Sequence, residues 1–372
     1  MRRKVLLMGL TFILLVGLIT AASLKPVSTA QADNLLQDVP RLDGYQVYFT
    51  EAAGEASRFD RSSVGLSRLA GLIELLGADL YTLEWRNGIP AEADLLVIAG
   101  PINDITPEQT AWLWDYLQGG GRLLVLAEPA VAPSKAFKSN AGLFQLMWDD
   151  MGLRVRDDVV VTESGEVRPV VPPTPRPKEG QPTPAPGPAE DTPILISNIL
   201  ATSINSLHPT TQGLEIGLNF FGTRSIEVDT TPREVQVTPL VYSDSQYYGE
   251  KDFVTYLQTG YVQFNIDTDT TRTNLVLAAA MDNIVNGGRI MLIGDRDFAT
   301  NGGGLQTSPS YSASFMYPDN VRFLVNTVAW LLDAESIAGE IAFPTPAPTA
   351  TPTTTPSPTP LPEPTATPTA SS

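Results

Sequence analysis

A few polar side chains follow apolar segments of the chain and could bind a polar ligand or a cation. The polar residues are Asn103, Glu128, Asp295 and Asp297, and Pro101 lies beside the first of them. If the apolar segments are parallel strands, their carboxyl ends meet at the sheet edge where open α/β folds bind ligands. The same residue types also suit turns and helix caps, in which they hydrogen-bond the local backbone. Both interpretations stay open.

Asp295 and Asp297 allow a catalytic alternative. Two carboxylates two residues apart after an apolar strand resemble the nucleophile loop of haloacid-dehalogenase-type phosphatases, with one as nucleophile and the other as general acid beside Mg²⁺. That motif has Thr or Val at the fifth position, where this chain has Ala299, and it normally opens its domain. A metal-dependent phosphohydrolase is therefore the less favoured hypothesis.

Composition excludes several other kinds of site. The 372 residues include no cysteine, which removes thiolate nucleophiles and Cys-ligated metals, and one histidine, His208, which we expect to be a structural hydrogen-bonding residue. The net charge of −17 gives no cationic stripe for nucleic acid. The sequence contains neither G-x-S-x-G nor a Walker motif. We expect no catalytic residue, cofactor or metal, and therefore a protein that is not an enzyme.

The first half of the chain alternates between strand and helix patterns. The short apolar runs predict strands, and apolar residues at helical spacing predict helices, one capped by Ser62 or Ser63 and another by the Thr106–Gln109 capping box. The expected strands are 44–50, 94–100 and 122–128, and the expected helices are 62–77, 106–118 and 141–153. Repeated β-α-β units with short loops predict a mostly parallel sheet with helices on both faces.

The second half is richer in strands. Segments such as 238–244, 261–266 and 274–281 are typical of strands. Residues 289–295 then repeat the buried-strand pattern ahead of an amphipathic helix at 320–333. This last β-α unit could rejoin the first sheet. Residues 194–285 would then form an antiparallel β-rich extension of the α/β domain.

Three segments differ in composition from this body. Residues 1–32 combine a basic start with a long uncharged run, so they are either a signal peptide or an N-terminal membrane anchor. Ten prolines lie in 169–193 and ten more in 344–372. We expect 169–193 to be a disordered insertion and 341–372 a disordered tail, because such segments have too few apolar side chains to offset their ordering entropy. The body is then divided into 40–168 and 194–340.

Several motifs in this order resemble the extracytoplasmic domain of GldG-type proteins, which are auxiliary components of ABC-type transport systems. They are D-L-L-V-I-A-G-P (94–101), T-P-E-Q (106–109), G-G-G-R-L-L-V-L-A-E-P (119–129), L-H-P-T-T-Q-G-L (207–214), V-T-P-L-V-Y-S-D (237–244), R-I-M-L-I-G-D-R-D-F-A-T-N (289–301) and N-x-x-x-W-L-L (326–332). The resemblance implies a flavodoxin-like sheet, related to class I glutamine amidotransferase folds, with permease and ATPase subunits as partners.

The chain departs from that family pattern in two ways. A Pro/Thr-rich tail stands where GldG-type proteins usually have a C-terminal transmembrane helix, so a membrane contact would depend on the N-terminal segment. The nucleophilic cysteine of the amidotransferase relatives is missing. We therefore expect a non-catalytic extracytoplasmic protein, either anchored in the membrane or secreted, that binds a partner or ligand for a transport system. The alternative is a stand-alone envelope or surface interaction module.

Overall fold

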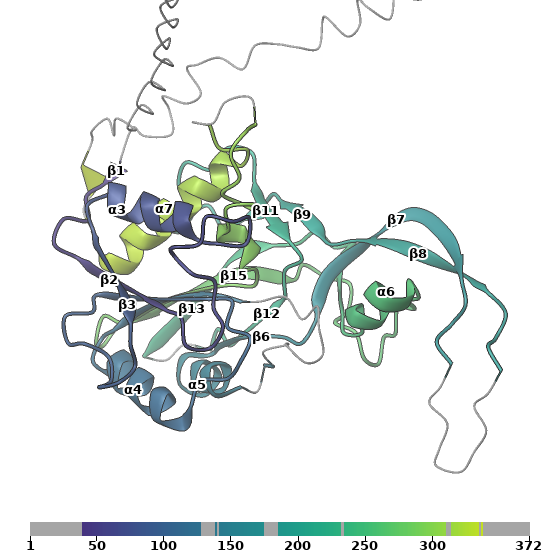
Figure 1. Ribbon diagram of the computed structural model, residues 1–372, viewed down its shortest axis with the longest axis horizontal. Helices are drawn as coiled ribbons and strands as arrows, with labels where there is room; N and C mark the ends of the chain where they lie inside the picture. The colour runs from purple at the N-terminus through teal and green to yellow at the C-terminus, as the bar shows by residue number, and fades with distance from the viewer. Residues whose placement is uncertain are drawn as a thin grey trace, which may run out of the picture.

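Five parallel strands form one half of a ten-stranded sheet in the computed structural model (Figure 1). Their order is β3 (Asp79–Leu83), β2 (Gln46–Thr50), β4 (Leu95–Ala99), β5 (Arg122–Leu126) and β16 (Arg289–Ile293). In chain order this is the arrangement 2-1-3-4-5, which puts the topological switch point between β2 and β4. The structure describes residues 39–127, 138–139, 141–174, 185–231, 234–309, 314–334 and 336–337.

The other half of the sheet is antiparallel. The added strands are β15 (Val276–Asn283), β13 (Val235–Tyr242) and β10 (Ser203–Ile204), with β12 (Ile226–Val228) and β6 (Leu153–Val155) branching from β15. The strand predicted at 289–295 is β16, and it pairs in parallel with β5 along its whole length. The parallel sheet expected from the first half of the chain, its last parallel strand at 289–295 and the antiparallel additions are therefore confirmed.

Helices cover both faces of the sheet. One face carries α3 (Ser67–Leu75), α7 (Pro318–Leu332), the 3-10 turns η2 (Pro209–Thr211) and η3 (Asp297–Ala299), and the paired strands β9 (Asn198–Ala201) and β11 (Leu218–Phe221). The opposite face carries α4 (Pro107–Gln118) and α5 (Gly142–Met151) (Figure 1). Every residue of β4 is buried, as its unbroken apolar run predicts for a strand covered on both sides.

The two predicted helix caps have different outcomes. Thr106 forms the full capping box of α4, with its hydroxyl accepting from the Gln109 N–H and the Gln109 side chain accepting from the Thr106 N–H. The cap predicted at Ser62 or Ser63 was wrong, because α3 begins at Ser67. The Asp60 carboxylate accepts hydrogen bonds from both the N–H and the hydroxyl of Ser62, which holds this segment in a turn.

A long β-hairpin extends away from the layered body and consists of β7 (Val159–Val170) and β8 (Glu190–Ile196) (Figure 1). The short strand β14 (Tyr248–Glu250) pairs with the base of β7, and α6 (Phe253–Thr259) lies beside the hairpin. We call β7 and β8 the arm.

The arm corrects the boundaries of the predicted disordered insertion, 169–193. Pro169 pairs with Asp191 and Pro193 pairs with Val167, so both ends of the Pro-rich stretch belong to strands. Antiparallel pairing continues to Val170 and Glu190, although the residues paired at this end are mostly polar. Residues 175–184 lie outside the described residues.

The strand predicted at 261–266 was also wrong. The N–H of Asn265 donates to the Asp269 carboxylate, and the N–H of Asp269 donates to the Asn265 carbonyl, so the end of this segment forms a turn. The side chains of Val262 and Phe264 nevertheless pack in a small core with the base of the arm. Their apolar character reflects this contact instead of a sheet position.

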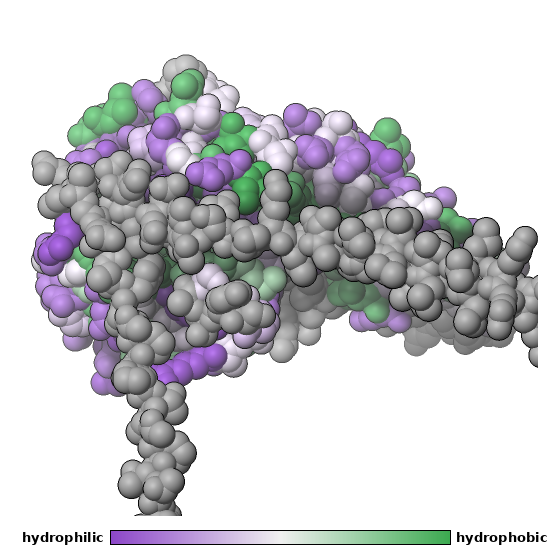
Figure 2. All heavy atoms as spheres, turned by 90° about the horizontal axis from the view of Figure 1, so that it is seen from above, coloured by the Kyte–Doolittle hydropathy of each residue, from purple (hydrophilic) through white to green (hydrophobic). Residues whose placement is uncertain are grey.

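The first and last described strands pair with each other. Strand β1 (Val39–Pro40) is antiparallel to β17 (Ser336–Ile337), so the two ends of the body lie side by side. The predictions for 1–32 and 341–372 fall on residues outside those described. Among the described residues, none of the helices has the length and apolar character needed to cross a membrane. On the face seen in Figure 2, hydrophobic groups are interspersed among hydrophilic ones.

Replacing Thr106 with Ala is expected to lower the free energy of unfolding by about 1 kcal/mol, because the N–H of Gln109 loses its capping acceptor. Urea unfolding followed by circular dichroism measures the change. Thr110→Ala is the matched control, since that hydroxyl donates only to the Thr106 carbonyl within the same helix and should be close to neutral. Equal stability of the two variants would contradict the role assigned to the capping box.

Candidate functional site

The loops after β2 and β4 bond to each other at the carboxyl edge of the sheet, where two predicted site residues lie. Pro101 is buried, and Asn103 donates from Nδ2 to the Ala53 carbonyl at 3.3 Å. The N–H groups of Ile102 and Asn103 donate to the same carbonyl, each at 3.0 Å. Asn103 therefore joins two loops at the switch point, as expected for a turn residue.

Asp295 follows β16 at the same edge and is completely buried. Its carboxylate accepts hydrogen bonds from the N–H of Phe221 at 2.6 Å and from the N–H of Asp297 at 2.8 Å. Burial raises the pKa of Asp295 to about 7, against the lowering effect of these N–H donors. The side chain ties β11 to the end of β16 and has no open path to a substrate.

Of the other two predicted carboxylates, the structure describes only Asp297. Asp297 begins η3 and pairs with the guanidinium of its neighbour Arg296 at 2.9 Å. Glu128 lies outside the described residues. In the part of the chain that the structure describes, no group of three or more His, Asp or Glu side chains is placed to hold a metal ion.

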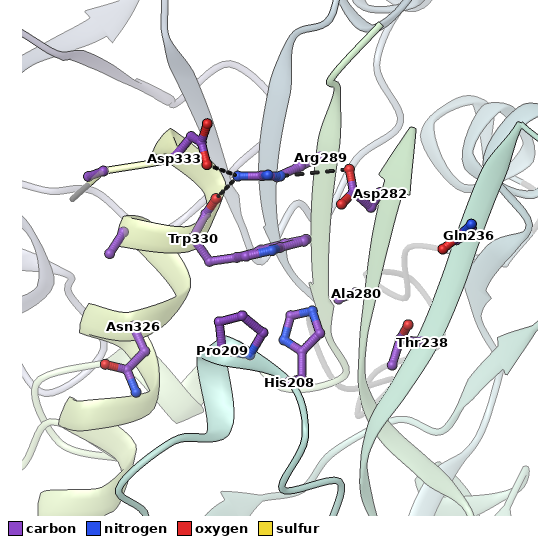
Figure 3. Close-up of a pocket in the computed structure, with 12 residues that line it drawn as sticks. His208, Pro209, Gln236, Thr238, Ala280, Asp282, Arg289, Asn326, Trp330 and Asp333 are labelled. Atoms are coloured by element: carbon purple, nitrogen blue, oxygen red, sulfur yellow. Dashed lines mark hydrogen bonds and ion pairs between the residues drawn. The ribbon is translucent and has the colours of Figure 1, made fainter. Parts of the chain in front are cut away.

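A cavity of about 560 Å³ lies at the opposite, amino edge of the parallel strands (Figure 3). It is bounded by the sheet strands β13, β15 and β16, by the last turns of α7, and by His208 and Pro209 at the start of η2. Ala280 on the sheet and Ala329 on α7 line it, and these small side chains leave the space between helix and sheet open. This volume falls within the range of small-molecule sites.

Three polar side chains form a row across the sheet in this cavity. The strand register places Gln236 of β13 opposite Asp282 of β15, and Asp282 opposite Arg289 of β16. Residues paired in this way share one face of the sheet. An amide, a carboxylate and a guanidinium therefore stand side by side along the cavity wall (Figure 3). We call Gln236, Asp282 and Arg289 the cross-strand row.

Arg289 holds the row against α7. Its Nη1 donates to the Trp330 carbonyl at 2.6 Å and to Asp333 at 3.1 Å, while Nε lies 3.7 Å from an oxygen of Asp282. The guanidinium carbon lies 5.3 Å from the centre of the Trp330 ring, a distance suited to a cation–π contact. The single positive charge of the cavity lining is thus placed between two carboxylates and an aromatic ring.

His208 lies on the other side of Trp330. Its ring meets Trp330 edge to face with centres 4.9 Å apart. The Thr210 N–H donates to Nδ1, which assigns the proton of the neutral ring to Nε2. Burial lowers the pKa of His208 to about 4, so the ring is uncharged near neutral pH. The predicted structural role is seen in this cap, and the histidine also lines the cavity.

The sequence-based reasoning missed this cavity and placed the candidate site at the other edge of the sheet. Four of the quoted motifs nevertheless contain cavity residues. L-H-P-T-T-Q-G-L includes His208, and V-T-P-L-V-Y-S-D includes Thr238. The motif at 289–301 begins with Arg289, and N-x-x-x-W-L-L includes Asn326 and Trp330. The signal that could have joined these motifs is their shared position, because they lie on or beside the face of the sheet that α7 covers.

Comparison with known proteins gives one extensive match. Residues 46–327 match the model of a family described as "ABC-type uncharacterized transport system". No curated protein matches the chain.

The solved structures that are similar to this chain have low sequence identity to it. The mmIFT52 N-terminal domain is 14% identical with a TM-score of 0.46, covering 77% of this chain and 97% of that one. A ThuA-like protein from Bacteroides uniformis is 11% identical with a TM-score of 0.39, covering 78% and 91%. The cytoplasmic protein STM1381 from Salmonella typhimurium is 12% identical with a TM-score of 0.34, covering 67% and 87%.

Asp295→Asn is expected to flatten the dependence of stability on pH. The unfolded carboxyl has a pKa of about 3.9, so between about pH 4 and pH 7 the folded protein holds a proton that the unfolded chain has lost. The free energy of unfolding of the wild type should therefore fall across this window as pH rises, by an amount on the order of a few kcal/mol, and Asn removes this contribution.

Urea unfolding at a series of pH values tests this expectation. Asp115→Asn, at an exposed position on α4, is the matched control and should leave the wild-type slope in place. Asp297 is unsuitable as the control, because its charge contributes to the raised pKa of Asp295. The assignment of the pH dependence to Asp295 is wrong if wild type and Asp295→Asn have the same slope.

Proposed function

We propose that this chain, which belongs to the "ABC-type uncharacterized transport system" family, is a non-catalytic auxiliary component of an ABC-type transport system. The observation that carries the proposal is the extent of the family match, residues 46–327. These residues run from the first strand of the main sheet, β2, into α7, and they include His208 and the cross-strand row. The family is therefore matched by the layered body as a whole, not by one short motif.

The more specific parts of the proposal have their own support. The strand order 2-1-3-4-5 supports a flavodoxin-like sheet of the GldG type. The basic and then uncharged N-terminal sequence supports an extracytoplasmic body that is anchored at 1–32 or secreted. Because β1 pairs with β17, an N-terminal anchor would hold the body by the same end from which the Pro/Thr-rich tail departs.

The contacts of the candidate residues support a binding role over catalysis. Both Asp295 oxygens accept backbone N–H donors in a fully buried position, so this carboxylate is unavailable as the nucleophile of a phosphohydrolase. The chain has no cysteine for amidotransferase chemistry. His208 uses Nδ1 within its own turn, where it accepts the Thr210 N–H.

Purification of the tagged full chain from membranes of its own organism tests the transporter partnership. After cross-linking in intact cells and detergent extraction, we expect mass spectrometry to recover a permease and an ATPase subunit that carries a Walker motif. The association should withstand the washing that removes non-specific membrane proteins, because a dedicated subunit contacts its partners through a defined surface.

The control is a chain in which residues 1–32 are replaced by a cleavable export signal. If the N-terminal segment is the anchor, this variant should leave the membrane fraction and recover much less of both subunits. Failure to recover either subunit with the unaltered chain would exclude the auxiliary role and favour a stand-alone envelope or surface module.

A further inference from the structure

We propose that the cavity at the amino edge of the sheet binds a small uncharged saccharide of one or two rings. Saccharide binding in this cavity does not require a transporter partner. The proposed saccharide site and the proposed transporter role can therefore be tested separately. It depends on three properties of the cavity lining: its charge balance, its free hydrogen-bonding groups and its apolar surface.

The charge balance favours a ligand without net charge. Arg289 pairs with the carboxylate of Asp282, so the cross-strand row has no net charge. The second carboxylate that Arg289 contacts, Asp333, is 73% exposed, and water screens its charge. Arg289 also donates to the Trp330 carbonyl. An anion that approached Arg289 would face both carboxylates, and a cation would compete with Arg289 for them. The low pKa of His208 keeps its ring neutral at physiological pH, so it adds no positive charge.

The free polar groups suit hydroxyls, each of which is both donor and acceptor. The Nε2–H of His208 has no partner among the described residues, and neither has the side chain of Gln236 or Thr238. Gln236 and Thr238 lie two residues apart on β13, so they present an amide and a hydroxyl on the same face of the strand. Asn326 donates from Nδ2 to backbone carbonyls, which leaves its Oδ1 as an acceptor.

The apolar surface is provided by a few side chains at the helix wall. Trp330 reaches from α7 across the cavity toward the sheet, and Pro209 lies beside it (Figure 3). Ala280 and Ala329 give a flat lining between the polar groups. A pyranose ring has one face of C–H groups and a rim of hydroxyls, and it can match both kinds of surface at once. A cavity of about 560 Å³ has space for one or two such rings.

Binding to the purified full chain tests the inference directly. The probes are glucose, galactose, mannose, N-acetylglucosamine, maltose, lactose and cellobiose, with glucuronate and glucosamine as charged comparators. Saturation-transfer NMR identifies binders and calorimetry gives the dissociation constant. We expect saturable binding of at least one neutral sugar, and weaker binding of the charged comparators by about tenfold, since each charge meets a like charge in the cross-strand row.

Two variants assign the binding to this cavity. Gln236→Ala removes hydrogen bonds to the ligand without breaking one in the protein, and it should weaken binding by about three- to tenfold. Ala280→Val places extra methyl groups in the cavity and should weaken or abolish binding. Gln258→Ala, at an exposed position on α6, is the matched control and should bind as the wild type does. Thermal unfolding checks that each variant is folded.

Three outcomes would overturn the inference: no saturable binding by any neutral sugar of the panel, equal or tighter binding of a charged comparator, or binding that Gln236→Ala and Ala280→Val leave unchanged. Each of these is independent of co-purification with permease and ATPase subunits. If the protein binds a sugar but recovers no transporter subunits, the cavity assignment stands and the transporter role is excluded. If it recovers the subunits but binds no sugar, the transporter role stands and the cavity assignment is wrong.

Discussion

The parallel pairing of β16 with β5 is the contact on which the rest of the structure depends. It brings together two segments that are far apart in the sequence and aligns five successive residue pairs, from Arg289 with Arg122 to Ile293 with Leu126. Closing so long a loop costs only slightly more entropy than closing a shorter one, because the cost grows with the logarithm of loop length. Burial of the apolar side chains on both strands offsets that cost. Strand β15 pairs with β16, and β13 with β15, so the antiparallel half of the sheet is positioned by this one ladder.

The two edges of the parallel strands have opposite properties. At the carboxyl edge, where folds of this kind usually bind ligands, the loops bond to each other through the Ala53 carbonyl and the Asp295 carboxylate. At the amino edge, the antiparallel strands extend the sheet under the last turns of α7. The small side chains of Ala280 and Ala329 leave the space between the helix and the sheet unfilled there. The open space therefore lies at the amino edge, beside the antiparallel strands, and not at the carboxyl edge.

Much of the fold could be predicted from the sequence because some elements are determined locally. Strand β4 is an unbroken apolar run, and α4 begins with a capping box whose hydrogen bonds join residues three apart. The start of α3 could not be predicted in this way, because a turn centred on the Asp60 side chain takes the place of the expected cap. The length of the arm could not be predicted either, because it depends on pairing between strands on either side of the Pro-rich stretch.

The candidate site could be predicted only in fragments. Asp295 and Asn103 were placed correctly at the carboxyl edge, but sequence could not tell that their hydrogen-bonding groups are used within the protein. The cross-strand row depends on the register of three strands that sequence spacing does not determine. A slip of one residue on β13 would turn Gln236 to the other face.

The arm has a consequence for how copies of this protein behave when crowded. A free-standing β-ribbon has open backbone edges, and these can pair with the edge of a neighbouring copy to form a continuous intermolecular sheet. Pro169 and Pro193 lie in β7 and β8, and proline has no N–H to offer such a neighbour. The same prolines that mark an irregular composition in the sequence thus remove two N–H donors from the ribbon. A continuous sheet between copies would therefore be interrupted at both positions.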